Sequence, residues 1–214
     1  MNNYFLDIEF SCTINSNRKN LTDDLILSVP DINFKVFDPG APNSYSEMVN
    51  GSILNADTEY CIFLSDKARP QSSKNFYKII QLLRMGYGLV GLYALGFFGI
   101  RKETIRRIGF FDERFVGGGQ EDMDFLFRLN EANIAYYYDL EIPFINMPSS
   151  WPPSDYNREL LSEKWSTVPN LCAWPSKDSC NQVRCLPETR PYANEFGDII
   201  GINFLDKTFT IHHK

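Results

Sequence analysis

The sequence predicts an α/β fold with a mainly parallel central sheet and helices on both faces of that sheet. Strand-like and helix-like patterns alternate through the first hundred residues, an order that is typical of parallel sheets. Hydrophobic residues make up 43% and aromatic residues 14% of the 214 residues, which is enough for a packed core. This length fits one domain, and the sequence contains no internal repeat or low-complexity segment.

Three apolar segments predict the first strands. They cover residues 4–13, 33–37 and 59–64, and each is followed by a polar turn. Alternation over residues 207–211 predicts a final strand. If the first three strands are parallel, their carboxyl ends lie on one edge of the sheet, where ligands bind in folds of this class.

Helices are predicted between these strands and after them. The clearest covers residues 73–85, where Phe76, Ile79, Ile80 and Leu83 recur at core spacing. A capping box predicts a helix that begins after Ser44. The other predicted helices cover residues 22–28, 121–133 and 156–165.

Short polar side chains lie at the ends of the three predicted strands. They are Thr13 and Asn15 on the first strand, Asp38 on the second, and Ser65 and Asp66 on the third. At one sheet edge, such side chains suit sugar hydroxyls, the edge of a nucleobase and a metal ion. Each also has a plain structural interpretation, since Asp38 before Pro-Gly is a common turn residue and Asn15 can cap a helix. No P-loop or G-x-G-x-x-G segment follows the first strand, so a bare phosphate site is not expected.

Residues 117–125, Gly-Gly-Gly-Gln-Glu-Asp-Met-Asp-Phe, place two adjacent carboxylates where a helix begins. Helical spacing puts Asp122 on the core-facing stripe, and it puts Asp124 and Arg128 on the solvated side as an ion pair. The helix dipole favours the ionised form of Asp122, which would let it act as a base. The alternative is that Asp122 or Glu121 simply caps the helix.

Residues 101–115 and the glycine-rich segment after them resemble the acceptor-side signature of GT-A glycosyltransferases. In that superfamily an arginine-containing helix leads into G-x-F-D-E-x-F and then G-x-E-D-x-D-x-x-x-R-L. The resemblance is strong over residues 95–135, looser over residues 4–95 and absent over most of residues 140–205. The whole chain is also similar to the N-terminal domain of a multidomain glycosyltransferase of a chlorella virus. That similarity implies further domains of a larger polypeptide and a virus-infected host cell.

The resemblance implies a single GT-A domain over residues 1–214, with a mixed, mainly parallel, Rossmann-like sheet. It makes residues 1–95 the nucleotide-binding half. It makes residues 96–214 the acceptor half, with an irregular segment over residues 143–192.

The resemblance also assigns residues to a nucleotide-sugar donor, here a UDP-sugar. The segment around Asp38 looks like the V-V-D-D-G-S strand end of family 2 transferases, which implies that Asp38 contacts the uridine. The segment from Thr13 to Arg18 lies where that family has P-x-Y-N-R. This match implies that Thr13, Asn15 and Arg18 lie next to the base and the ribose.

Residues 62–67 match the strand that in this family usually ends in Asp-x-Asp and holds Mn²⁺ or Mg²⁺ against the diphosphate. Here Ser65 and Lys67 take the first and third positions, so Asp66 is the only carboxylate. The resemblance implies that Ser65 and Asp66 contact the donor and that Asp66 binds the metal, with His212 as a second ligand. Two alternatives stay open: Lys67 neutralises the diphosphate without a metal, or His212 is merely solvated.

These assignments predict a metal-dependent hexosyltransferase that moves a sugar from a UDP-sugar to a glycan acceptor. Asp122 would take the proton of the acceptor hydroxyl, which gives inversion, and Glu121 would hold the acceptor or the loop. A sugar nucleotidyltransferase shares the layout but would want a glycine-rich loop after the first strand. A non-catalytic nucleotide- or carbohydrate-binding module would keep the binding residues and release no UDP.

Composition argues against other partners. The net charge is −6 and no long basic run is present, so no nucleic-acid partner is expected. No apolar stretch reaches about 18 residues, so no membrane span is expected. The first residues lack the basic region and apolar core of a signal peptide, so a cytoplasmic location is expected.

Overall fold

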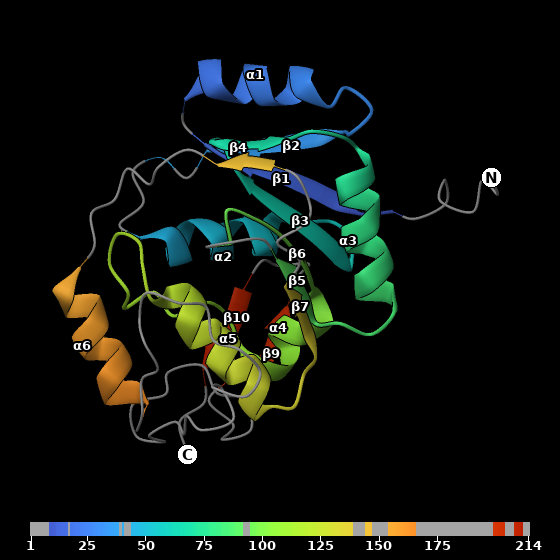
Figure 1. Cartoon of the computed structure of the whole chain (residues 1–214). Coiled ribbons are helices and arrows are strands. Elements are labelled where there is room, and N and C mark those ends of the chain that lie inside the picture. The colour runs from blue at the N-terminus through green and yellow to red at the C-terminus, as the bar shows by residue number, and fades with distance from the viewer. Residues whose placement is uncertain are drawn as a thin grey trace. The chain divides into compact units, whose positions relative to one another are not determined.

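The structure is a computed structural model of the chain (Figure 1). The chain divides into two compact units. The structure describes residues 9–16, 18–38, 40, 44–91, 95–138, 144–146, 154–165, 199–203 and 208–211. The first unit contains Met1–Gly40, Ala56–Lys102 and Tyr136–Pro148. The second unit contains Ala41–Asn55, Glu103–Ala135 and Ser149–Lys214.

The first unit is built on a six-stranded sheet with the strand order β2-β1-β3-β6-β5-β7. The strands are β1 (Ser11–Asn15), β2 (Phe34–Phe37), β3 (Tyr60–Ser65), β5 (Leu89–Gly91), β6 (Phe97–Arg101) and β7 (Tyr136–Tyr138). β1 pairs in parallel with β2 and β3, and β5 pairs in parallel with β7. β6 is antiparallel to both of its neighbours, β3 and β5. The sheet is therefore mixed and mostly parallel, as the sequence predicted.

The three parallel strands β1, β2 and β3 end at the same level. Asn15, the last residue of β1, pairs with Phe37 on one side and with Ser65 on the other. The segments that follow these strands therefore leave the sheet along one edge.

Two helices share a core with one face of this sheet. α3 (Lys74–Arg84) contributes the four predicted core residues, Phe76, Ile79, Ile80 and Leu83, and each is at most 1% exposed. α1 (Lys19–Ser28) adds the buried Leu25 to the same cluster. Gly99 of β6 lets α3 approach closely, because a Cβ there would lie 2.3 Å from the Cγ2 of Ile79. A short antiparallel pair, β4 (Ala68–Pro70) and β8 (Phe144–Asn146), completes the first unit.

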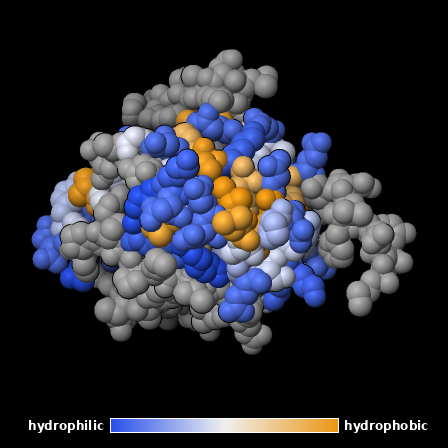
Figure 2. Space-filling model, turned by 90° about the horizontal axis from the view of Figure 1, so that it is seen from above, coloured by the Kyte–Doolittle hydropathy of each residue, from blue (hydrophilic) through white to orange (hydrophobic). Residues whose placement is uncertain are grey.

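The surface on the side of α1 is mixed. Figure 2 views the molecule from that side and shows hydrophobic atoms next to a broad hydrophilic area. Leu27 of α1 is 76% exposed and Val36 of β2 is 49% exposed.

Within the described part of the chain, no helix has the length and apolar character that crossing a membrane requires.

The second unit is mainly helical. Its helices are α2 (Tyr45–Asn55), α4 (Lys102–Ile108), α5 (Glu121–Glu131) and α6 (Asp155–Lys164), and β9 (Ile199–Asn203) pairs with β10 (Thr208–Ile211) in an antiparallel hairpin. The predicted cap of α2 is confirmed, since the Oγ of Ser44 accepts a hydrogen bond from the Glu47 N–H at 3.0 Å. β10 confirms the strand predicted over residues 207–211.

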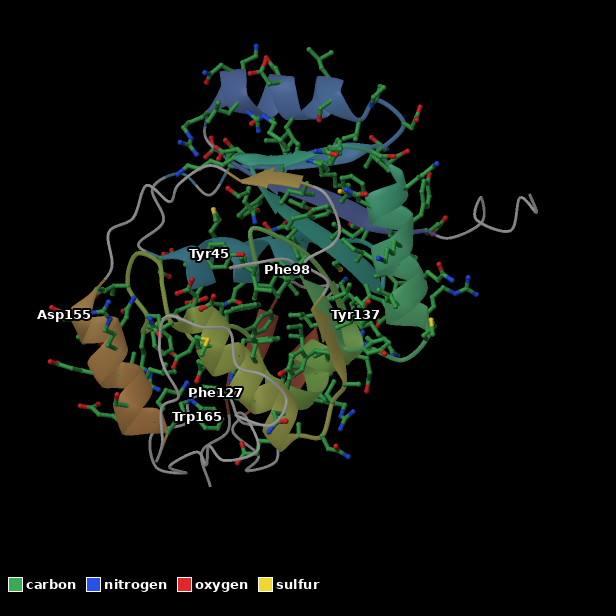
Figure 3. All side chains as sticks on the ribbon, viewed as in Figure 1. Tyr45, Phe98, Phe127, Tyr137, Asp155 and Trp165 are labelled. Carbon is green, nitrogen blue, oxygen red and sulfur yellow. The ribbon has the colours of Figure 1, made fainter. Side chains whose placement is uncertain are left out.

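α5 and α6 pack together through aromatic and aliphatic side chains. The rings of Phe127 and Trp165 meet edge to face, with centroids 5.1 Å apart (Figure 3). Leu160 and Leu161 of α6 join the same cluster, and so does Met123 of α5. This core fixes the start of α5 within the second unit.

Candidate functional site

In the first unit, the carboxylate of Asp66 joins the ends of β1 and β3. The Arg18 guanidinium forms a two-point ion pair with this carboxylate. Its Nε donates a hydrogen bond to Oδ2 at 2.8 Å, and its Nη2 donates one to Oδ1. The Oγ of Ser16 donates a short hydrogen bond, 2.5 Å long, to Oδ2. Only 4% of the Asp66 side chain is exposed, whereas 41% of the Arg18 side chain is. The structure therefore brings two of the predicted site residues, Arg18 and Asp66, into direct contact.

Ser16, which the sequence did not single out, organises this cluster. Its backbone N–H donates to the carbonyl of Phe37 at 3.1 Å, which ties the end of β1 to the end of β2. Its Oγ also accepts a hydrogen bond from the Arg18 N–H at 2.8 Å. One serine thus links three strand ends to the start of α1. A serine in a polar turn is too common a signal for the sequence alone to reveal this role.

The charges around Asp66 suit an anionic ligand. Lys67 follows it directly, and the pKa of Lys67 is lowered by partial burial and by the positive charge of Arg18, against the opposing effect of Asp66. Two cationic side chains therefore lie beside one carboxylate. An excess of positive charge with guanidinium donors is the environment in which phosphate oxygens bind well.

The remaining predicted donor residues take different positions at this edge. Thr13 and Asn15 are buried within β1, at 4% and 5% exposure. The Oγ of Ser65 is an acceptor for the Lys67 N–H at 3.3 Å. Asp38 is exposed, and its Oδ1 accepts a hydrogen bond from the Gly40 N–H at 2.8 Å. Asp38 thus forms the turn that its position before Pro-Gly indicated, while its carboxylate remains open to solvent.

Protein side chains alone do not form a metal centre in the described residues. No three His, Cys, Asp or Glu side chains converge there in a way that could hold a metal ion. Both oxygens of Asp66 already accept hydrogen bonds from Arg18 or Ser16. His212, the predicted second ligand, lies outside the described residues. Asp66 fits a divalent cation only if Arg18 releases the carboxylate and a bound ligand supplies most of the oxygens.

In the second unit, a glycine loop leads into α5. Gly117, Gly119 and Gln120 all lie in the left-handed region, with φ of 64°, 107° and 80°. A Cβ added at either glycine would meet nothing within 4 Å, so backbone conformation rather than space requires glycine there. The side chain of Gln120 does not cap the helix.

Glu121 and Asp122 follow this loop and differ in environment. Glu121 is 6% exposed, and its Oε2 has no hydrogen-bond partner in the described part of the chain. Burial and the adjacent charge of Asp122 raise the pKa of Glu121 to about 8. Asp122 is partly exposed, and its Oδ1 accepts a hydrogen bond from the Met123 N–H at 2.8 Å. Burial raises the pKa of Asp122 as well, against the lowering effect of backbone hydrogen bonds.

Tyr45, labelled in Figure 3, lies at the start of α2. It interacts electrostatically with these two carboxyl groups. Its pKa is raised well above the usual value by burial and then by the charges of Glu121 and Asp122. Its backbone N–H donates to the carbonyl of Gly117 at 2.6 Å, and Ser44 and Gly117 form an isolated parallel bridge. The starts of α2 and α5 therefore meet through the glycine loop.

The predicted orientation of α5 is wrong in one respect. Asp124 and Arg128 form the predicted i,i+4 ion pair, at 3.0 Å, but they are 0% and 1% exposed rather than solvated. Asp122, placed on the core-facing stripe by its spacing, is instead partly exposed. The reason is that other buried groups compensate the charged pair: Arg128 donates to the Ile108 carbonyl at 2.7 Å, and Trp165 Nε1 donates to Asp124 at 3.1 Å.

A second buried carboxylate, Asp112, belongs to the same network. The Nζ of Lys164 lies 2.8 Å from Asp112 and 2.5 Å from Asp124, and all three side chains are fully buried. Arg114 donates hydrogen bonds from its Nε and Nη2 to the carboxylate of Asp112, at 3.0–3.2 Å. Burial alone would raise the pKa of Asp112, but the charges of Lys164 and Arg114 and their hydrogen bonds outweigh it and lower this pKa to about 2. The sequence offered no signal for this network, because its partners lie 52 residues apart.

Comparison with known proteins identifies the fold. No protein-family model matches the sequence, and no curated protein sequence matches it. The structure is similar to Drosophila β1,4-galactosyltransferase 7, solved with manganese, UDP-Gal and xylobiose, with a TM-score of 0.51 and 9% identity over 70% of this chain and 78% of that one. It is also similar to a mannosyltransferase from Pyrobaculum calidifontis, solved with GDP-Man and Mn²⁺, with a TM-score of 0.54 and 9% identity over 86% of this chain and 67% of that one.

These similarities do not bear on the resemblance to a chlorella virus enzyme, which stays a prediction. In the sheet described above, three of the parallel strands end together beside a polar cluster. The chain is a mixed α/β protein, and its fold is the GT-A fold of these glycosyltransferases.

Proposed function

We propose that the protein is a glycosyltransferase that moves a hexose from a UDP-sugar to a hydroxyl of a carbohydrate acceptor. The observation that carries this proposal is the cluster of Arg18, Ser16 and Asp66, which lies where three parallel strands of a GT-A fold end. Strand ends of this kind are the usual ligand position in open α/β sheets. Both similar structures were solved with a nucleotide-sugar, which supports the same class of donor.

In this proposal the first unit binds the donor. Asp38, with its exposed carboxylate, contacts the uridine, and Thr13 and Asn15 of β1 lie next to the base and the ribose. Ser65 and Arg18 contact the donor at the neighbouring strand ends. Arg18 and Lys67 supply positive charge for the diphosphate.

The proposal includes a divalent cation at Asp66. When bound, Mn²⁺ or Mg²⁺ would offset the negative charge that the diphosphate gains as it leaves. Asp66 would be its protein ligand, with His212 as a proposed second one. Arg18, once released from Asp66, is then free to hold phosphate oxygens.

In the second unit, Asp122 is the proposed base. It removes the proton from the acceptor hydroxyl while that oxygen forms a bond to the anomeric carbon, and the bond from that carbon to the diphosphate breaks. Attack opposite the leaving group inverts the configuration. Two adjacent carboxyl groups resist double ionisation, so Glu121, with a pKa of about 8, keeps its proton at neutral pH and leaves the charge on Asp122. A protonated Glu121 can donate a hydrogen bond to the acceptor.

Turnover of UDP-sugars tests the proposal. The protein is incubated with UDP-glucose, UDP-galactose and related donors, with and without Mn²⁺ and candidate sugar acceptors, and the release of UDP is measured. Acceptor-dependent release of UDP is expected. Formation of UTP from a UDP-sugar and pyrophosphate would instead identify a nucleotidyltransferase, and binding without any turnover would identify a non-catalytic module.

A further inference from the structure

The side chain of Asn157, on α6, is bonded entirely to the backbone of the glycine loop. Its Oδ1 accepts a hydrogen bond from the Val116 N–H at 3.0 Å. Its Nδ2 donates to the carbonyls of Val116 and Gly119, both at 2.9 Å. The residue is 0% exposed. Three hydrogen bonds from one buried amide therefore hold both ends of a four-residue segment.

At this end of the loop, Gly119 and Gln120 lie in the left-handed region, and the Gln120 side chain makes no capping hydrogen bond. The backbone of Gly119 is hydrogen-bonded to the Glu121 carboxyl group and that of Gln120 to the Asp122 carboxyl group, so the loop and the two carboxyl groups are directly linked. Left-handed residues in succession persist only where surrounding contacts determine them. On the opposite side, the Tyr45 N–H holds the carbonyl of Gly117. The loop is thus clamped between α2 and α6, and Asn157 supplies the α6 side of the clamp.

α6 is itself well anchored, so it can serve as a rigid support. At its first turn, the Oγ of Ser154 accepts a hydrogen bond from the Asn157 N–H at 3.3 Å. At its last turn, the buried Lys164 binds Asp112 and Asp124, and the neighbouring Trp165 binds Asp124. The first turn of α6 is therefore closed by its own cap, and its last turn is fixed against Asp112 and Asp124, which lie on the segments that flank the glycine loop.

We propose that Asn157 is a positioning residue that holds the glycine loop and thereby orients Glu121 and Asp122 at the start of α5. This inference rests on the proposed function, in which Asp122 acts as the base. Asn157 touches neither carboxyl group in any contact described above, so it would act only through the backbone of residues 116–120. The ionisable groups that face this region are Glu121, Asp122 and Asp124 from α5 and Tyr45 from α2.

The first test does not depend on enzymatic activity. The side-chain carboxyl of Glu121 is titrated by ¹³C NMR in the full-length protein and in Asn157→Ala, with Ser154→Ala as the matched control. Ser154→Ala weakens the start of the same helix but keeps all three bonds from Asn157 to the loop. We expect the midpoint for Glu121 to fall toward its ordinary value in Asn157→Ala, because a relaxed loop exposes the carboxyl group, and to stay in place in Ser154→Ala. An unchanged midpoint in a folded Asn157→Ala would overturn the proposal, as would equal shifts in both variants.

The second test uses the reaction. A displaced base lowers kcat by about 10- to 100-fold in Asn157→Ala, while KM for the UDP-sugar changes less than about 3-fold. Asn157→Asp keeps an oxygen that accepts from the Val116 N–H, but its ionised carboxylate faces the carbonyls of Val116 and Gly119 and cannot donate to them. Protonation of this carboxylate should restore a hydrogen-bond donor. The ratio of kcat for Asn157→Asp to kcat for Asn157→Ala should therefore rise as the pH falls from 7 to 5, and a ratio independent of pH counts against the clamp.

If the unmodified protein turns over no donor at all, the proposed function fails, while the NMR titration still decides whether Asn157 orients the carboxyl groups.

Discussion

Glu121 and Asp122 are neighbours in the sequence but occupy different environments. Both carboxyl groups have backbone hydrogen bonds, but Glu121 is buried and its Oε2 has no partner in the described residues, whereas Asp122 is partly exposed. Environment rather than residue type sets which carboxyl group is ionised. In the proposed function, the two residues therefore have separate roles: Asp122 is the proposed base and Glu121 the proposed neutral donor.

Replacing Asp122 with Asn tests the first role. The amide keeps the shape and the hydrogen bond from Met123 but cannot take a proton, so kcat should fall by about 10²- to 10⁴-fold. Binding of UDP, measured by calorimetry, should stay within about 2-fold of the unmodified protein. Near-normal turnover in a variant that still binds UDP would remove Asp122 as the base.

Replacing Glu121 with Gln tests the second role through stability. The pKa of Glu121 is raised in the folded state from 4.5 to about 8, so the folded protein binds this proton more tightly than the unfolded chain. The resulting stabilisation is complete below pH 4.5 and is lost as the pH rises toward 8, by at most about 1.4 kcal/mol per pH unit. Glu121→Gln removes this loss, so its advantage over the unmodified protein should grow between pH 5 and pH 8.

Urea denaturation at several pH values measures this effect. The exposed Glu159 of α6 offers a control, since Glu159→Gln should follow the pH dependence of the unmodified protein. If Glu121→Gln also follows that dependence, the Glu121 carboxyl is not protonated in the folded state and cannot serve as a neutral donor.

At the residue scale, the sequence predicted which residues lie together better than it predicted whether those residues are buried. It correctly paired Asp124 with Arg128 and brought Arg18 and Asp66 to the same edge of the sheet. It placed the first pair in solvent because helical spacing treats charged residues as a polar face. The buried Lys164, which adds a second positive charge next to Asp124, lies 40 residues farther along the chain than Asp124. A local sequence pattern cannot reveal a partner at that separation.

At the scale of elements, the ion pair of Arg18 and Asp66 connects the segments that follow β1 and β3. Asp66 is nearly buried while Arg18 remains partly exposed, so the arginine is the partner that can move. A cation that competes for Asp66 must displace it. The connection between β1 and α1 therefore controls access to the only carboxylate that directly follows β3.

Replacing Arg18 with Met should make Asp66 available to a metal. An ion pair with a half-exposed partner contributes about 1 kcal/mol or less, so the affinity for Mn²⁺ should rise severalfold at most. Electron paramagnetic resonance of free Mn²⁺ measures the binding. Arg84→Met, at an exposed position of α3, is the matched control and should leave the affinity unchanged.

The variant that lacks both side chains, Arg18→Met with Asp66→Asn, should bind no Mn²⁺ at this edge. If removing Arg18 leaves Mn²⁺ binding unaltered while UDP binding weakens, Arg18 serves the diphosphate directly and Asp66 is not a metal ligand.

Elements with strong periodicity were predicted well. α3 lies over residues 74–84, and all four of its predicted core residues are buried, because a large apolar stripe leaves a clear helical signal. β5 and β6 were not predicted as strands. They are short, contain glycine and pair antiparallel in the middle of the sheet, a position that depends on tertiary pairing rather than on local preference.

At the scale of the whole molecule, this chain and the similar glycosyltransferase structures share a fold at very low sequence identity. The similar structures share only 9–10% of their residues with this chain, yet the mainly parallel sheet and the start of a helix at two carboxylates could be predicted from patterns of polarity. Polar strand ends and a glycine loop carry more information about this fold than residue identity does, because they set where the backbone can turn.

The network around Lys164 has a consequence for how the protein is made. During synthesis, Asp112, Asp124 and Arg128 join the chain before Lys164 and Trp165 do. Until Lys164 and Trp165 emerge, packing α5 would bury two carboxylates without all of the partners that they have in the finished protein. The buried charges of the second unit therefore gain their full set of partners only once the last turn of α6 is present, so this core is completed late in synthesis.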